Sequence, residues 1–261
     1  MTLQPLKWYK QLATTKGRVA AGVFLVEGRR AIGQLMQHHR QAVCEILSIE
    51  ALPPAWGSLP NRYVTASQLR AMAHTQTPQG TVAVVRLPLA TYHDALPGRI
   101  GAKVLLLEDV QDPGNVGTLI RTAAAFGFAG VILSEKCADP FAPKCVQATA
   151  GTVLSVWLRR TPRYMHMLKT LQQQGYTCMA ADIHGSEAPA RLAAQPRLVL
   201  ALGSEGAGLS TALLQLAEAR ISIPIGPYAE SLNVAVCGAI CMYVSATGEG
   251  QALMAQHLQA K

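Results

Sequence analysis

The segment from Val104 to Ser134, VLLLEDVQDPGNVGTLIRTAAAFGFAGVILS, constrains the fold more than any other part of the chain. An apolar run ends in an acidic turn that contains Pro and Gly. Apolar residues at helical spacing follow, and then a second apolar run. Apolar strands that alternate with helices are typical of a parallel sheet, in which the helix forms the crossover connection. The segment therefore predicts a strand, a helix over residues 116–126 and a second, parallel strand.

The remaining C-terminal sequence repeats this alternation. Apolar runs occur in TCMAADI, RLVLALG and RISIPIG, and helical spacing covers residues 163–174, 210–218 and 231–246. Strands that are apolar along most of their length are typical of a parallel sheet with helices on both faces. We predict an α/β fold built on such a sheet.

The first third of the chain predicts a separate, small α/β domain. Strand candidates such as AAGVFLVEG and GTVAVVRLP flank a helix candidate, RRAIGQLMQHHR. The segment LATYHDALPGRIG then has the Pro and Gly content of a linker. We place the domain boundary there, which divides the chain into residues 1–95 and 96–261.

The positive charge is concentrated in the first of these domains. The net charge is +8, and residues 1–95 hold ten Lys and Arg against four Asp and Glu. This excess suggests a surface for a polyanion, although a merely solvated basic face remains the alternative.

Neither a membrane span nor a metal site is expected. No apolar run reaches the length of about 18–20 residues that a span needs, and the N-terminus lacks an apolar signal core. The six cysteines include no C-x-x-C pair, which disfavours zinc and suits free thiols in a reducing compartment. A cytoplasmic protein is the default. The absence of a G-x-S-x-G elbow disfavours hydrolases of that type.

Two polar residues stand out around the helix predicted over 116–126. Asn115 precedes it, so its side chain could be a structural N-cap or a functional group. Arg121 faces away from the apolar stripe, near the strand ends where α/β sheets bind ligands. Its guanidinium suits a phosphate or a polarised oxygen, and a surface ion pair is the alternative.

Two later segments also combine strand ends with polar residues. In LVLALGSEGAGLS, glycines surround Glu205 in a loop that a ligand could approach closely, but their spacing is not the dinucleotide-binding fingerprint. In ISIPIGPYAESLNVAVCGAICMY, Ser231 is the expected N-cap of the last helix, which is apolar nearly all round and should be buried. Asn233 in its first turn would then need a hydrogen-bond partner.

The three segments together resemble the signature motifs of the SpoU (TrmH-like) family of RNA 2′-O-ribose methyltransferases, in the knotted SPOUT superfamily. The matching stretches are DPGNVGTLIRTAAAFG, LALGSEGAGLS and ISIPIGPYAESLNVAVCGAI, in the family's order. GVFLVEG and TPQGTVAVV resemble the family's ribosomal-protein-like substrate-binding domain.

The resemblance implies a C-terminal trefoil knot and S-adenosylmethionine bound by knot loops, mostly through backbone groups. It also implies a homodimer whose active site uses both chains. Carried over by position, the cofactor residues would be Leu202, Gly203, Gly206, Ile223 and Leu232. The remaining site residues would be Glu205, Ser231 and Asn233, with Asn115 and Arg121 facing the RNA.

The resemblance assigns Arg121 to activation of the ribose hydroxyl. Because an arginine stays protonated, we expect it to hold the adjacent phosphate rather than to act as a base. Asn115 and Asn233 can both donate and accept hydrogen bonds, which suits positioning. One departure is Gln147, which stands where the family often has Arg, so that this phosphate contact would be either absent or supplied by Lys144.

We expect the first domain to recognise folded RNA through phosphates and exposed loop nucleotides. Ribosomal RNA is the preferred target because this domain resembles that of the rRNA-modifying members, and transfer RNA is the alternative. An RNA-binding protein without catalysis remains open, and a nicotinamide-dependent oxidoreductase is disfavoured by the glycine spacing. The candidate RNA contacts in this domain are Arg18, Arg29, Arg30 and Arg40.

Overall fold

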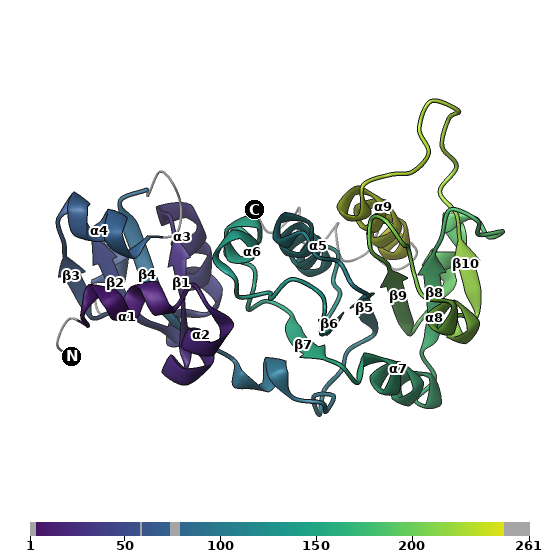
Figure 1. The fold of residues 1–261 in the computed structure, drawn as a ribbon, viewed down its shortest axis with the longest axis horizontal. Helices are drawn as coiled ribbons and strands as arrows, with labels where there is room; N and C mark the ends of the chain where they lie inside the picture. The colour runs from purple at the N-terminus through teal and green to yellow at the C-terminus, as the bar shows by residue number, and fades with distance from the viewer. Residues whose placement is uncertain (1–3, 58, 74–78, 248–261) are drawn as a thin grey trace.

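The computed structural model describes residues 4–57, 59–73 and 79–247, and it contains two α/β units side by side (Figure 1). The first unit has a four-stranded sheet in the order β1-β4-β2-β3, in which only β2 and β3 pair in parallel. Its strands are β1 Val23–Glu27, β2 Val43–Ser48, β3 Asn61–Tyr63 and β4 Thr81–Arg86. Its helices are α1 Leu6–Gln11, α2 Thr15–Ala21, α3 Arg29–His38 and α4 Ala66–Met72.

The second unit has a six-stranded sheet in the order β10-β8-β9-β5-β6-β7, in which every pairing is parallel. The α/β fold with a parallel sheet is therefore confirmed. Its strands are β5 Lys103–Leu107, β6 Gly130–Ser134, β7 Trp157–Thr161, β8 Thr177–Ala181, β9 Leu198–Leu202 and β10 Ala219–Ile221. Its helices are α5 Pro113–Ala125, α6 Pro143–Ala148, α7 Tyr164–Gln173, α8 Thr211–Leu216 and α9 Val234–Thr247.

Alternate residues of the central strands pack on opposite faces of this sheet. Leu105 and Leu107 join one apolar cluster with α5 and α9, whereas Val104 and Leu106 join another with α7 and α8. Both faces are covered, which explains why β5 is buried along its whole length. Figure 1 shows α5 and α9 on one side of the sheet and α7 on the other.

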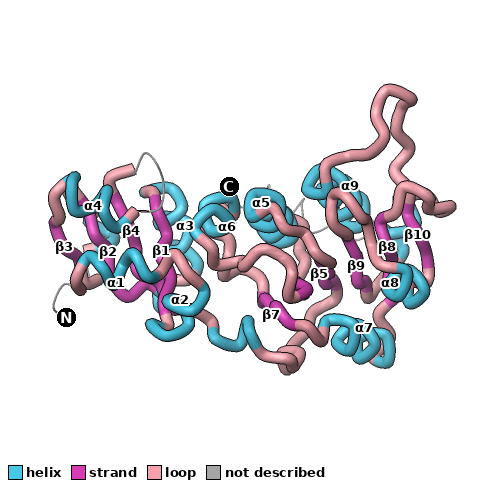
Figure 2. The backbone as a smooth tube through the Cα atoms, in the orientation of Figure 1, coloured by secondary structure: helices cyan, strands magenta, loops and turns pink. Residues whose placement is uncertain are grey.

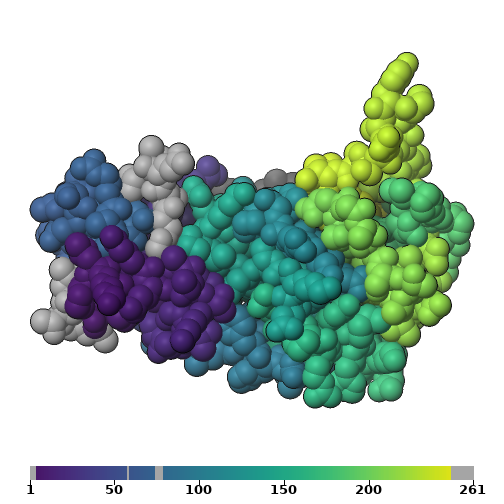
Figure 3. Space-filling view, viewed as in Figure 1, coloured from purple at the N-terminus to yellow at the C-terminus, as the bar shows by residue number. Residues whose placement is uncertain are grey.

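Strand order places two distant segments at one edge of the sheet. β9 pairs with β5, in the register Leu107 with Leu202, so the loops that follow these two strands begin side by side. Helix α9 packs against α5 and brings the third segment to the same place. The loop from β10 to α9 projects away from the body of the molecule, as Figures 2 and 3 show.

Two predicted helix starts were wrong by three residues. Helix α5 begins at Pro113 and is capped by Asp112, whose side chain accepts a hydrogen bond from the Asn115 N–H. Asn115 therefore lies inside the helix and does not cap it. Helix α9 begins at Val234 rather than at Ser231, and the Asn233 side chain accepts from the first-turn amides.

The last helix is less buried than its composition suggested. Val236 and Tyr243 of α9 are 49% and 53% exposed, and the Tyr243 ring lies beside that of Phe126, with centroids 5.8 Å apart. One apolar face of the helix is thus open to solvent in the single chain.

The segment after β4 lies against the second sheet. Its 3-10 turn at Leu89–Tyr92 contacts β7, and the carbonyls of Ala95 and Ile100 accept from Arg159 Nε at 2.6 Å and Trp157 Nε1 at 2.8 Å. The sheet edge is covered in this way by chain that follows the first unit.

Candidate functional site

The side chains of Glu205, Asn115 and Asn233 form a continuous line of hydrogen bonds, here called the Glu–Asn–Asn chain. The Asn115 amide nitrogen donates to the Glu205 carboxylate, and the Asn115 amide oxygen accepts from Asn233 Nδ2 at 3.2 Å. One residue comes from each of the three segments that the sequence analysis singled out. The pairing of β5 with β9 and the packing of α9 on α5 bring them together.

Asp112 leaves the Asn115 side chain free for this role. One Asp112 carboxylate oxygen caps α5 by accepting from the Asn115 N–H at 2.9 Å, and the other pairs with Lys144 Nζ at 3.1 Å. The amide and the lysine hold the pKa of Asp112 below its usual value. The sequence analysis missed Asp112, although an Asp-Pro pair at a helix start is a common N-terminal signal.

Asn233 is oriented by its own helix. Its amide oxygen accepts from the backbone N–H groups of Ala235 at 2.9 Å and Val236 at 3.3 Å, which orients its NH₂ group toward Asn115. Asn233 is exposed yet hydrogen-bonded at both ends of its amide. Ser231 is also exposed, and within the part of the chain described its hydroxyl has no hydrogen bond.

The loop that carries Glu205 closes on itself. Ser204 and Gly208 exchange two backbone hydrogen bonds of 3.2 and 3.0 Å. A Cβ at Gly203 would overlap the Gly208 backbone, so glycine is required there by the turn itself. A Cβ at Gly206 would meet nothing within 4 Å, so that side of the loop is open.

Glu108 anchors this loop to the sheet, and the sequence analysis missed it. It follows β5, is 3% exposed, and accepts from the Ser210 N–H at 2.6 Å, the Ser210 hydroxyl at 2.8 Å and the Tyr164 hydroxyl at 2.6 Å. Burial and the neighbouring carboxylate raise the pKa of Tyr164. The available signal was an acidic residue placed directly after a fully apolar strand, where only a hydrogen-bonded carboxylate is tolerated.

The predicted cofactor residues come from two loops: Leu202, Gly203 and Gly206 lie at the end of β9 and in the loop after it, and Ile223 and Leu232 lie near the two ends of the projecting loop. Leu202 is buried, Gly203, Ile223 and Leu232 are partly buried, and Gly206 is exposed. Over residues 223–232 the backbone makes a single internal hydrogen bond, from the Ala229 N–H to the Gly226 carbonyl at 3.4 Å. The segment therefore combines apolar side chains with backbone donors and acceptors that no other part of the described chain occupies.

Arg121 is exposed on α5, as its place on the helical wheel predicted. It has no hydrogen bond or ion pair with any residue that the structure describes, so a single copy of the chain does not bring it into the Glu–Asn–Asn chain.

One of the predicted RNA contacts was wrong. Arg18 is 1% exposed because Asp139 and two backbone carbonyls of its own unit surround its guanidinium. Arg30 is exposed, Arg29 is exposed and donates to the Ala51 carbonyl, and Arg40 is partly exposed and donates to the Ala55 carbonyl. Lys144 is exposed and pairs with Asp112.

Within residues 4–57, 59–73 and 79–247, no helix is long and apolar enough to cross a bilayer. All six cysteines are free, and four of them are buried.

Comparison with known proteins identifies the family. Residues 102–243 match the model of the SpoU rRNA Methylase family, and residues 4–83 match that of the MRM3-like substrate binding domain. The chain belongs to the SpoU rRNA methylase family. The resemblance drawn from the three motifs is thus confirmed, and these motifs supply the three side chains of the Glu–Asn–Asn chain.

Two rRNA-modifying relatives of this SpoU family member match it over most of their length. One is the 23S rRNA (guanosine(2553)-2′-O)-methyltransferase RlmP of Bacillus subtilis, 33% identical over 92% of this chain and 95% of its own. Another is a 23S rRNA (uridine(2479)-2′-O)-methyltransferase of Streptomyces viridochromogenes, 30% identical over 91% and 87%. Among solved structures, the SpoU methyltransferase AviRb of S. viridochromogenes, in complex with the cofactor AdoMet, has a TM-score of 0.78 at 27% identity over 92% and 96% of the two chains.

Proposed function

We propose that this chain transfers a methyl group from S-adenosylmethionine to a ribose 2′-hydroxyl of ribosomal RNA. Membership of the SpoU family supports methyl transfer, and the two relatives named as rRNA 2′-O-methyltransferases support the acceptor. The single observation that carries the proposal to this chain is the Glu–Asn–Asn chain, because it assembles one side chain from each family motif. We propose residues 1–95 as the RNA-binding domain and 96–261 as the catalytic domain.

The residues around the projecting loop suit S-adenosylmethionine. The adenine of the cofactor binds where hydrogen-bond donors and acceptors lie beside apolar side chains. The segment from Ile223 to Leu232 has both, because most of its backbone N–H and C=O groups make no hydrogen bond within the described chain. Gly206 leaves open space beside the loop after β9, and Leu202 and Gly203 precede it at the end of the strand. When bound, the cofactor supplies an already activated methyl group. We propose that the trefoil knot of the superfamily forms in this part of the chain.

In this proposal the Glu–Asn–Asn chain positions the ribose hydroxyl. Asn115 is restrained on both sides of its amide, so it can present a fixed polar group without reorganisation. Glu205 is the ionisable member of the chain and the one that can take up a proton. Arg121 is exposed and cationic, and we assign it to the phosphate next to the target ribose. Ser231 lies in the same loop as Leu232 and borders the site.

The exposed face of α9 supports a homodimer. Val236 and Tyr243 form an apolar surface beside Phe126, and such a surface is typical of a subunit contact. Because α9 packs on α5, a second copy on this face would lie next to the helix that carries Arg121 and would complete the site from both chains. We place the enzyme in the cytoplasm, where ribosomal RNA of bacteria such as those of the relatives is made.

The test is transfer of labelled methyl from S-adenosylmethionine to unmodified ribosomal and transfer RNA, by the unaltered chain and by Arg121→Ala. A methylated 2′-oxygen protects the adjacent phosphodiester from alkali, so the product can be mapped. The matched control is Lys169→Ala, which removes an exposed cation from α7 on the opposite face of the sheet.

Protection at one rRNA position, lost in Arg121→Ala and kept in Lys169→Ala, supports the proposal. Protection of transfer RNA alone changes the substrate class. No transfer to naked RNA despite cofactor binding points to a ribonucleoprotein particle as substrate. No cofactor binding contradicts the proposal and favours an RNA-binding protein without catalysis.

A further inference from the structure

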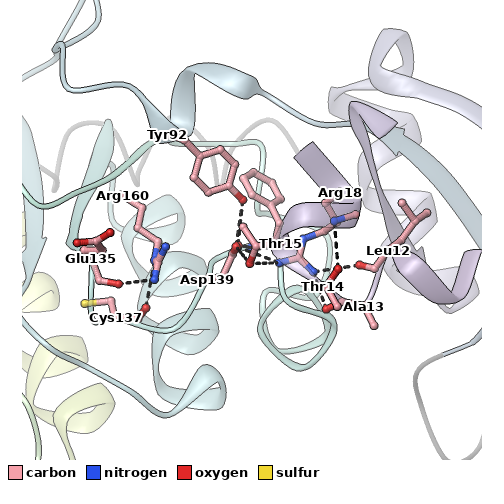
Figure 4. Close-up of polar contacts among 12 residues, drawn as sticks. Leu12, Ala13, Thr14, Thr15, Arg18, Tyr92, Glu135, Cys137, Asp139 and Arg160 are labelled. Atoms are coloured by element: carbon pink, nitrogen blue, oxygen red, sulfur yellow. Dashed lines mark hydrogen bonds and ion pairs between the residues drawn. The ribbon is translucent and has the colours of Figure 1, made fainter. Parts of the chain in front are cut away.

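Asp139 lies between the two units and is contacted by donors from three parts of the chain. It belongs to the loop from β6 to α6 and is 9% exposed. Its carboxylate accepts from Thr15 Oγ1 at 2.7 Å and from Arg18 Nη2 at 2.9 Å, both on α2. It also accepts from the Tyr92 hydroxyl at 3.1 Å (Figure 4). The Phe141 N–H donates to it at 2.8 Å.

Arg18 is committed to this contact. Its Nη1 donates to the carbonyls of Leu12 at 3.0 Å and Ala13 at 2.8 Å, and its Nη2 also donates to Thr15 Oγ1 at 3.2 Å. Its Nε is buried without a hydrogen-bond partner, which costs folding stability. The contact with Asp139 therefore fixes the orientation of the guanidinium even though one of its donors is left unpaired. The orientation of α2 relative to the Asp139 loop is therefore set by directional bonds.

The loop that carries Asp139 is fixed at its other end by the second sheet. Arg160 of β7 donates from Nε to the Cys137 carbonyl at 3.2 Å and from Nη2 to the Glu135 carbonyl (Figure 4). In the same loop, Phe141 packs on Phe24 of β1 with ring centroids 4.8 Å apart. The cores of the two units are continuous across this contact.

A direct path of packed groups leads from this loop to the candidate site. Helix α6 follows the loop and packs on α5 so closely that a Cβ at Gly117 would overlap the Cys145 carbonyl. Lys144 of α6 also pairs with Asp112, the cap of α5. Helix α5 carries Asn115 and Arg121, so a displacement of α6 displaces both.

We propose that Asp139 is a positioning residue for methyl transfer: by holding Arg18, Thr15 and Tyr92, it sets the RNA-binding unit at the angle that delivers the target ribose to α5. This inference rests on the proposed function. A buried ion pair contributes little net stability, because desolvation of both charges offsets their attraction. The role of this pair is therefore to fix the orientation of the two units rather than to stabilise the fold. Apolar contacts such as Phe24 with Phe141 hold the units together but tolerate sliding.

The experiment uses a double variant of the full chain, because the single change at Asp139 is ambiguous. Asp139→Asn keeps the size of the side chain but leaves the Arg18 charge buried without a partner, which risks misfolding. The double variant Arg18→Met with Asp139→Leu removes both charges and fills the space with apolar groups, so that no charge is left buried without a partner. The matched control is Glu187→Gln, which breaks the exposed ion pair of Glu187 with Arg191 at 2.6 Å.

Four quantities are measured: S-adenosylmethionine affinity, RNA affinity, kcat, and the distribution of interdomain distances by small-angle X-ray scattering. We expect the double variant to keep both affinities within about threefold, to lose roughly 10- to 100-fold in kcat, and to show a broader distance distribution, because small misplacements of reacting groups have effects of this size. Glu187→Gln should match the unaltered chain in all four.

An unchanged kcat or an unchanged distance distribution in the folded double variant would overturn the proposal. A parallel loss of cofactor affinity and kcat would also overturn it, because general damage would then explain the loss. If the unaltered chain itself transfers no methyl group, the proposed function fails, while the scattering data still decide whether Asp139 sets the domain angle.

Discussion

At the residue scale, the site depends on asparagine side chains whose amide oxygen and amide nitrogen are both hydrogen-bonded. Asn115 joins Glu205 to Asn233, and Asn233 is in turn held by the first amides of α9. Sequence analysis selected all three residues from the motifs, and the structure brings their side chains into contact. It left Asn115 as either a cap or a functional group, and the structure excludes capping because Asp112 is the cap.

Asn115→Ala should lower kcat about 100-fold with little change in cofactor affinity, since the link between Glu205 and Asn233 is lost while the projecting loop is untouched. Steady-state kinetics with saturating RNA and calorimetric titration of S-adenosylmethionine would check this. Thr118→Ala, on an exposed position one turn along α5, is the control. Full activity of Asn115→Ala would remove the Glu–Asn–Asn chain from the reaction.

Asp112→Ala should lower the free energy of unfolding by about 1 kcal/mol at pH 7, which is typical of a lost N-cap. The pKa of Asp112 is lowered in the folded chain by the Asn115 amide and by Lys144, so its stabilisation is complete above the unfolded pKa of about 3.9 and is lost as the pH falls through the folded value. Urea denaturation of the unaltered protein and of Asp112→Ala should show that their difference in free energy of unfolding becomes smaller between pH 7 and pH 3. The control is Glu230→Ala, at an exposed position. A difference that is constant with pH would contradict the assignment.

At the scale of elements, the contact of α5 with α6 depends on a glycine. Most strands and helices followed from periodicity, but α1, α2, α6 and β7 were missed. Strand β7 has the sequence WLRRT, and its two arginines give it the polarity of a loop. Arginines are accommodated there because β7 is an edge strand and both side chains donate hydrogen bonds to loop carbonyls. The short α6 has too few residues for a periodic signal.

Gly117→Ala should lower the free energy of unfolding by about 1–3 kcal/mol, because the added methyl overlaps the Cys145 carbonyl and the Ala148 side chain. This is the reverse of the usual gain when alanine replaces glycine in a helix. Thermal or urea unfolding measures it. Gly98→Ala, where a Cβ meets nothing within 4 Å, should leave stability nearly unchanged. An equal or higher stability for Gly117→Ala would show that α6 can move away from α5 freely.

At the scale of the whole molecule, one apolar face of α9 is exposed to solvent in the single chain. Val236 and Tyr243 are about half exposed in one chain, on the helix next to α5. The expectation that this helix would be buried all round stays compatible with a second copy, which would bury the same face.

Tyr243→Asp should convert a homodimer into a monomer, because a charge in an apolar contact is left without a partner. Light scattering on a size-exclusion column would measure the mass. Tyr63→Asp is the matched control, since Tyr63 is 70% exposed on β3 of the other unit. A monomeric unaltered chain, or a Tyr243→Asp dimer as stable as the original, would contradict the proposed interface.

The sequence by itself determined the order of most elements, the α/β class, the family and the three motifs, because periodicity and turn residues act over a few positions. Only the tertiary structure decided which of these residues meet. Asn115 is 90 positions from Glu205 and 118 from Asn233, and the partner that buries Arg18 is Asp139 in the other unit. Local sequence patterns do not predict such pairs. The pairs form because β9 lies beside β5 in the sheet and α9 packs on α5. The same long-range packing turned one expected RNA contact into a buried link between the two units.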